Sequence, residues 1–212
     1  PEKDLEQAVA ELGEVDKNLV GHMQPPEEFS PAQYRPEPTE PAVYSPGEKV
    51  STREAYGSAL AGIHADYPDM VVLDGEVSNS THAASFAQSY PDRFFEMFIA
   101  EQNMAGAALG LSLRGKKPFV STFAAFMSRA LDQIRMSRYS EPNLVFAGSH
   151  AGISIGEDGA SQMGLEDVAM FRSVLDSVVF HPCDGTSTEK VAREAAELEG
   201  ITYIRTLRGK TL

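Results

Sequence analysis

The sequence predicts an α/β fold in which a mostly parallel sheet carries helices on both faces. Between residues 70 and 205, short apolar runs that suit strands alternate with longer segments that suit helices. Apolar strands that alternate with helices indicate a parallel sheet covered on both faces. In open sheets of this kind, ligands bind at the carboxyl ends of the strands. We therefore look for functional residues at the ends of the predicted elements.

The chain is expected to divide into two parts, residues 1–49 and residues 50–212. A short amphipathic helix is predicted over residues 2–12, because apolar side chains recur at helical spacing at Leu5, Ala8, Val9 and Leu12. Seven of the 13 prolines then fall between Met23 and Gly47. Proline at this density blocks helices and strand ladders, and it favours an extended linker. The alternative, a proline-rich docking ligand, lacks a basic residue beside its P-x-x-P core.

The second part opens with a helix start signal. Ser51 and Glu54 form a capping-box pattern, so a helix is expected from Ser51 to about Asp66. Further helices are predicted at residues 80–89, from Glu101 onward, and at 124–138, 165–174 and 187–198. Strands are predicted at residues 70–73, 94–95, 119–121, 144–147, 178–180 and 202–205.

Composition limits the possible functions. The 18 Lys and Arg residues face 31 Asp and Glu residues, a formal net charge of −13. This balance argues against nucleic acid as a partner, while phosphorylated metabolites need only a local basic cluster. The single cysteine, Cys183, permits no internal disulfide, and neither a membrane segment nor a secretory signal is visible. We expect a cytoplasmic protein, and the start at Pro1 suggests a processed chain or a piece of a longer one.

Residues 98–126 stand out within the second part. Glu101 opens a helix of small and apolar side chains, and the strand that follows leads to Phe123 and Phe126. The small residues allow close packing, so we expect the carboxylate to be shielded from water. From the pattern alone, a capping acid and ordinary core phenylalanines are the more common interpretations.

Several motifs occur in one order along the chain. They are Ser51-Thr52-Arg53, Asn79-Ser80-Thr81, Ala100-Glu101-Gln102-Asn103-Met104, Ser121-Thr122-Phe123-Ala124-Ala125-Phe126, Asp132-Gln133-Ile134-Arg135 and Gly156-Glu157-Asp158-Gly159. From about Ser51 to Arg208 the chain closely resembles the pyrimidine-binding domain of transketolases. These thiamine diphosphate enzymes transfer a two-carbon ketol unit between sugar phosphates in the pentose phosphate pathway. The resemblance implies the thiamine diphosphate-binding pyrimidine-domain fold.

The resemblance implies roles for residues on the cofactor side. Glu101 matches the protonated carboxyl that hydrogen-bonds a ring nitrogen of the aminopyrimidine, which lets the cofactor remove its own thiazolium proton. Phe123 and Phe126 match the pair that packs against this ring. Arg129 stands where some transketolases carry a tyrosine, so its role is open.

The resemblance also implies a substrate side. Arg53, Ser80, His150 and Arg208 match the positions that bind the sugar phosphate group, and two guanidiniums, an imidazole and a hydroxyl suit a phosphate. Asp158 matches a carboxylate that reads a substrate hydroxyl, and Gln162 stands where many transketolases have a substrate-contacting histidine. Taken singly, each would be a surface or capping residue, and Ser80 would be a helix N-cap. The other histidines, His22, His64, His82 and His181, show no metal spacing.

One family motif is missing. Transketolases hold Mg²⁺ and the cofactor's diphosphate through a Gly-Asp-Gly motif on a separate domain, and this sequence has none. We therefore expect a fragment or split subunit that is inactive without a diphosphate-binding partner and homodimeric in the full enzyme. The alternatives are another thiamine diphosphate enzyme, such as deoxyxylulose phosphate synthase or an oxo-acid dehydrogenase, and a non-catalytic interaction module. His150, Asp158 and the arginines favour transketolase.

Overall fold

The computed structural model describes residues 2–13, 18 and 40–211. The chain divides into two compact units, residues 1–33 and residues 34–212. In the first unit, the predicted amphipathic helix is present as α1 (Glu2–Leu12), with all its residues exposed. Most of the predicted proline-rich linker lies outside the described residues. No helix among the residues described is long and apolar enough to cross a membrane.

The second unit is built on a parallel sheet of six strands in the order β3-β2-β4-β5-β7-β6. Each strand contains or overlaps one of the predicted apolar runs. The strands are β2 (Met70–Asp74), β3 (Phe94–Glu96), β4 (Lys117–Phe123), β5 (Leu144–Ser149), β6 (Val178–Phe180) and β7 (Ile201–Arg205).

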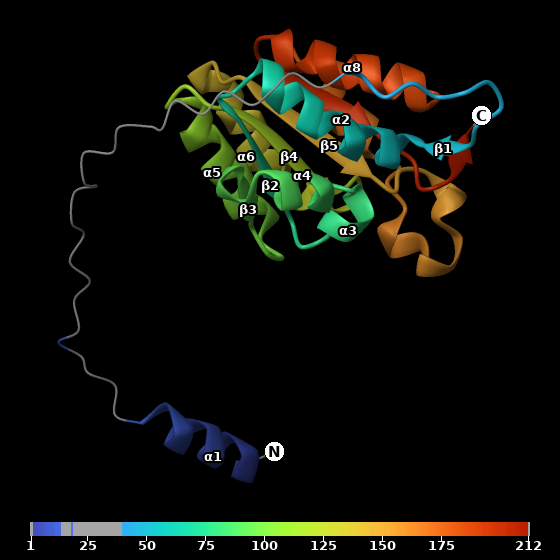
Figure 1. The fold of residues 1–212 in the computed structure, drawn as a ribbon. Coiled ribbons are helices and arrows are strands. Elements are labelled where there is room, and N and C mark those ends of the chain that lie inside the picture. The colour runs from blue at the N-terminus through green and yellow to red at the C-terminus, as the bar shows by residue number, and fades with distance from the viewer. Residues whose placement is uncertain (1, 14–17, 19–39, 212) are drawn as a thin grey trace. The chain divides into compact units, whose positions relative to one another are not determined.

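Helices cover both faces of this sheet (Figure 1). Met70 and Val72 of β2 belong to the core under α2 (Thr52–Asp66), α4 (Ala84–Ser89) and α8 (Gly185–Glu197). Val71 and Leu73 point to the opposite core, under α5 (Glu101–Ser112), α6 (Leu131–Ser137) and α7 (Asp167–Arg172). Successive side chains of a strand point to opposite faces, so both faces of this sheet are buried. The predicted fold class is confirmed.

The helix predicted over residues 80–89 is wrong as one element. It is split into α3 (Ser78–Thr81) and α4, with His82 between them at a left-handed φ of 63°. His82 packs against Gly57 of α2, where an added Cβ would lie 2.4 Å from the His82 Cβ. The missing side chain at Gly57 therefore permits the close approach that interrupts the helix. Ser80 lies inside α3, so the N-cap alternative for it is wrong too.

The helix predicted over residues 124–138 also differs. A 3-10 helix at Phe126–Ala130 precedes α6, and another at Arg138–Ser140 follows it. The Ser128 hydroxyl donates to the Ala125 carbonyl at 2.8 Å. Such local serine bonds compete with regular helical bonding, which accounts for the tighter turn here.

A small antiparallel pair was not predicted. β1 (Val50–Ser51) pairs with β8 (Lys210–Thr211). Ser51 also caps α2, because its hydroxyl oxygen accepts a hydrogen bond from the Glu54 amide at 3.3 Å. The Glu54 carboxylate accepts from the Ser51 hydroxyl instead of from its backbone, so the capping box is only half formed.

Candidate active site

The predicted site residues gather near the carboxyl ends of the central strands. Phe123 ends β4, His150 follows β5 directly, and Arg208 lies three residues after the end of β7. β4, β5 and β7 are adjacent and parallel, so their ends share one edge of the sheet. The parallel topology thus collects residues that are far apart in sequence.

Glu101 is the first residue of α5 and is 4% exposed. The expected shielding of this carboxylate is present, with Met104, Ala105 and Ala108 of the same helix packed into the core. Its partner is Arg129, whose Nη1 donates to Glu101 Oε1 at 2.9 Å. The Arg129 side chain is 54% exposed, so the pair joins a buried acid to a solvent-facing cation.

Aromatic rings form a column beside this pair. Phe123 and Phe126 are stacked with centroids 5.1 Å apart and an interplanar angle of 15°. His150 stacks on Phe123 at 4.0 Å, and the Arg129 guanidinium lies 5.4 Å from the Phe126 ring centroid. One series of contacts therefore runs from Glu101 to His150, and it joins the predicted cofactor side to the predicted substrate side.

His150 is held in an unusual position. It is 3% exposed and has a left-handed φ of 57°, which is uncommon for a residue with a side chain. Its Nδ1 lies 2.9 Å from the Ser149 hydroxyl. Burial, followed by the charges of Arg53 and Arg208, lowers the pKa of His150 to about 4. The imidazole is therefore neutral near pH 7.

Two arginines approach one another next to His150. Arg53 Nη1 donates to the Ser80 carbonyl at 2.7 Å, and its buried Nε has no hydrogen-bond partner in the part of the chain that the structure describes. Burial lowers the pKa of Arg53, and the nearby charge of Arg208 lowers it further. Two neighbouring guanidiniums with a free N–H donor suit an anion.

A loop from Ala151 to Gly164 carries Asp158 and Gln162. Ala151 and Gly164 form a bridge, and the Gly152 amide donates to the Gly164 carbonyl at 2.8 Å, so the loop is closed at its base. Arg208 Nη1 reaches across the loop to the Ile155 carbonyl at 2.9 Å and to Asp158 at 3.0 Å. Gln162 lies in the same loop, at the end of a short 3-10 helix.

Asp74 was missed by the sequence reasoning. It ends β2 fully buried, and it accepts hydrogen bonds from the Val77 amide and the Thr81 hydroxyl, both at 2.7 Å. Burial raises the pKa of Asp74 to about 7 despite these two bonds. Asp74 thereby holds α3, which carries Ser80. The signal available in the sequence was an acid placed directly after the apolar run at residues 70–73.

The arrangement suits a flat heterocycle beside a phosphorylated ligand. The aromatic column offers flat apolar surface, the Glu101 carboxylate lies at its end, and the unpaired Arg53 Nε lies on the anion side. No group of three or more potential metal ligands occurs within residues 2–13, 18 and 40–211.

The family described as "Transketolase, pyrimidine binding domain" matches residues 48–211. The chain belongs to this family. It is 50% identical to the transketolase-like protein 2 of Mus musculus over 201 residues, which are 93% of this chain and 32% of the relative. It is 54% identical to the transketolase of Homo sapiens over 166 residues, 78% of this chain and 27% of that protein. The chain thus spans about a third of the length of these curated relatives.

Solved structures agree with this assignment. A split gene transketolase, described as an inactive beta4 tetramer, aligns with a TM-score of 0.67 and 46% identity, covering 76% of this chain and 52% of that one. A transketolase from Leishmania mexicana aligns with a TM-score of 0.70 and 26% identity, covering 77% of this chain and 26% of that one. The predicted identity as a transketolase pyrimidine-binding domain is confirmed.

Proposed function

We propose that this chain supplies the pyrimidine-binding and sugar-phosphate-binding half of a transketolase active site. Residues 50–212 form the working domain. The completed enzyme transfers a two-carbon ketol unit between sugar phosphates in the pentose phosphate pathway. The observation that supports this most is the unbroken series of contacts from Glu101 through Arg129, Phe126 and Phe123 to His150.

On the cofactor side, Glu101, Phe123 and Phe126 would hold the aminopyrimidine of thiamine diphosphate. When bound, the cofactor supplies the carbanion that takes up the ketol unit. Glu101 would hold a proton and donate it as a hydrogen bond to a ring nitrogen. Arg129 donates to Oε1, which leaves Oε2 as the oxygen that would carry the proton. Phe123 is 7% exposed and fixes the wall against which the ring rests.

On the substrate side, Arg53 and Arg208 would neutralise the phosphate of the sugar. Their mutual repulsion is relieved when an anion binds between them. His150 is neutral and can donate or accept a hydrogen bond without adding charge. Asp158 would bind a substrate hydroxyl, while Ser80 and Gln162 complete this side.

We propose further that the chain is inactive alone. A diphosphate-binding domain or subunit would hold Mg²⁺ and the diphosphate, and the complete enzyme would be a cytoplasmic homodimer. Support comes from two facts: the sequence has no Gly-Asp-Gly motif, and the related split gene transketolase is an inactive beta4 tetramer. α5 contributes a face with little bulk to such a dimer, because Gly106 and Gly110 are exposed and an added Cβ at either would meet nothing within 4 Å.

The test is ketol transfer by the chain alone and by the chain mixed with its cognate diphosphate-binding subunit. Both samples contain thiamine diphosphate, Mg²⁺, a ketose phosphate donor and an aldose phosphate acceptor. We expect turnover only in the mixture. Turnover by the chain alone would show that no partner is needed. A stable complex of the two subunits without turnover would refute the proposed activity and favour a non-catalytic module.

A further inference from the structure

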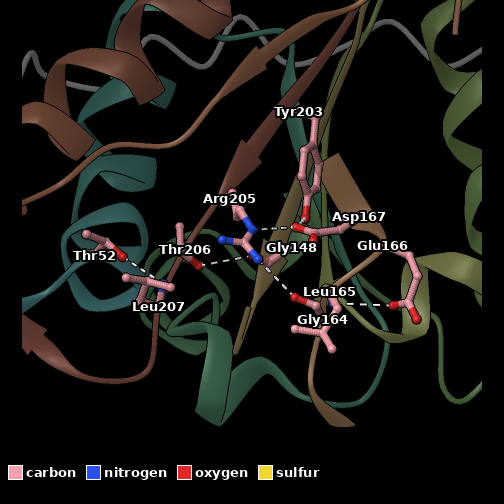
Figure 2. A network of polar contacts seen from close by, with 10 residues as sticks. All are labelled: Thr52, Gly148, Gly164, Leu165, Glu166, Asp167, Tyr203, Arg205, Thr206 and Leu207. Carbon is pink, nitrogen blue, oxygen red and sulfur yellow. Dashed lines mark hydrogen bonds and ion pairs between the residues drawn. The ribbon is translucent and has the colours of Figure 1, made fainter. Parts of the chain in front are cut away.

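A buried ionic network lies behind the loop that carries Asp158 and Gln162. Asp167, the first residue of α7, is 1% exposed. Its Oδ2 accepts hydrogen bonds from the Tyr203 hydroxyl at 2.7 Å and from Arg205 Nε at 2.8 Å. Figure 2 shows Arg205 at the end of β7, with dashed lines to both Asp167 and Gly164.

The second bond of Arg205 goes to the base of the loop. Its Nη2 donates to the Gly164 carbonyl at 2.9 Å, the same oxygen that accepts from the Gly152 amide. The Ala151 amide donates to the Thr206 carbonyl at 3.1 Å, directly after Arg205 in the chain. Both ends of the loop are therefore attached to the strand end that holds Arg205.

The base of the loop is also closely packed against the chain between Phe123 and Phe126. At Gly164, an added Cβ would lie 2.5 Å from the Ala124 Cβ and 3.1 Å from the Ala125 amide nitrogen. Ala124 and Ala125 connect Phe123 to Phe126, so the base of the loop presses on the turn between the two rings. A shift of Gly164 would disturb the aromatic column as well as the loop.

A buried ion pair costs desolvation and is weak evidence for stability by itself. The Arg205 guanidinium instead fixes the positions of two groups, because its Nε and Nη2 donate to two acceptors in fixed directions. Asp167 fixes the orientation of Arg205, and Arg205 fixes the Gly164 carbonyl. Arg208, three residues later, binds the middle of the same loop at Ile155 and Asp158.

We propose that Arg205 and Asp167 are positioning residues that lock the base of loop 151–164 and so present Asp158 and Gln162 to the sugar phosphate. This inference rests on the proposed function for its ligand. The attachment of the loop base to Arg205 is a property of the chain itself, so it can be tested without an activity assay.

The first experiment measures backbone hydrogen exchange in the chain itself. Arg205→Lys keeps the charge beside Asp167 but cannot bind both acceptors, so the Ala151 and Gly152 amides should exchange about tenfold faster while those of β2 and β4 are unchanged. Tyr203→Phe is the matched control, because it removes a bond to the same Asp167 oxygen and leaves both Arg205 bonds in place. Unchanged exchange in Arg205→Lys, equal acceleration throughout the chain, or the same acceleration in Tyr203→Phe would overturn the inference.

The second experiment uses the chain completed by its diphosphate-binding subunit. Arg205→Lys should raise the KM for the sugar phosphate about fivefold, with half-saturation by thiamine diphosphate within about twofold of wild type. If exchange rises while this KM stays unchanged, the positioning role is wrong. If Arg205→Lys folds poorly, Asp167→Asn weakens the same anchor and should give the same pattern. Absence of turnover in the wild-type mixture would refute the proposed function. The hydrogen-exchange result would still show whether Arg205 holds the base of loop 151–164.

Discussion

The cofactor side and the substrate side of the proposed site are built differently. The cofactor side uses the first residue of α5 (Glu101), the end of β4 (Phe123) and the 3-10 turn after it (Phe126). The substrate side includes a loop of 3-10 turns that carries Asp158 and Gln162. On the cofactor side, Glu101 and Phe123 are buried, and Phe126 is partly buried and stacked on Phe123. The substrate-side loop is held by hydrogen bonds and charge, through Arg205 at the base of the loop and Arg208 at its middle.

The difference has a chemical reason. A carboxyl that serves as an acid needs a fixed position and little water, and packing supplies both. A group that recognises a phosphorylated sugar must admit and release a charged ligand, so exposed charged side chains suit it. Changes on the cofactor side should therefore affect turnover, and changes on the substrate side should affect the KM.

Glu101→Gln should give the largest effect. The amide keeps the size of the side chain but cannot donate the acid proton, so turnover of the completed enzyme should fall about a hundredfold or more, roughly 3 kcal/mol. Binding of thiamine diphosphate, measured by calorimetry, should change much less. Near-normal turnover at saturating cofactor would mean that Glu101 is only a capping acid. The proposed difference between a cofactor side that controls turnover and a substrate side that controls the KM would then fail.

His150→Asn should change the pH dependence of stability. Because the pKa of His150 is lowered to about 4, the unfolded chain binds the proton first as the pH falls below 6.5. The free energy of unfolding therefore falls as the pH drops from 6.5, and it is about 3 kcal/mol lower at pH 4. Asparagine tolerates the left-handed φ and does not titrate, so the variant should lack this loss.

Urea unfolding of both proteins at pH 7 and pH 4 measures the difference. The raised pKa of Asp74, about 7, works in the opposite direction, since it removes stability as the pH rises from 3.8 toward 7. This contribution is common to both proteins and cancels. Parallel pH profiles would mean that His150 is not desolvated as described.

Arg208→Ala should mainly affect substrate binding. We expect the KM for the phosphorylated sugar to rise about tenfold, with a smaller change in turnover, because the contact is to a non-reacting group. Lys116→Ala is the control, since Lys116 pairs with Asp69 at the opposite edge of the sheet. A fall in turnover with an unchanged KM would contradict this prediction and assign Arg208 to the cofactor side.

Gly156→Ala should have the smallest effect. Gly156 has a φ of 72° and a ψ of −113°, and an added Cβ would meet nothing within 4 Å, so the substitution costs backbone strain alone, at least about 1 kcal/mol. Gly106→Ala on α5 is equally free of contacts but helical, and should raise stability by about 0.5 kcal/mol. Equal unfolding midpoints in urea would show that the loop adopts another conformation in solution.

Much of the fold was predictable because each strand of the six-stranded sheet contains a short apolar run. The exceptions depend on contacts between distant elements. The break at His82 needs the missing side chain of Gly57 in another helix. The β1–β8 pair joins segments of two residues each, too short to show a periodic pattern.

The site followed a similar rule. The order of motifs predicted a set of site residues. The structure brings four of them, Glu101, Phe123, Phe126 and His150, into one series of contacts through Arg129. The partners of these residues were not predictable. Arg129 is 28 residues from Glu101, and Arg205 is 38 residues from Asp167, so each pairing depends on the packing of helices and strands.

The β1–β8 pair places residues 50 and 211 side by side. A unit whose two ends meet can be inserted into a longer polypeptide, or separated from it by gene fission, without altering its sheet. Its relatives fit this view. The matching region makes up about a third of the curated transketolases and 52% of the split gene protein. The β1–β8 pair thus joins the two ends of the region that matches the transketolase pyrimidine-binding family.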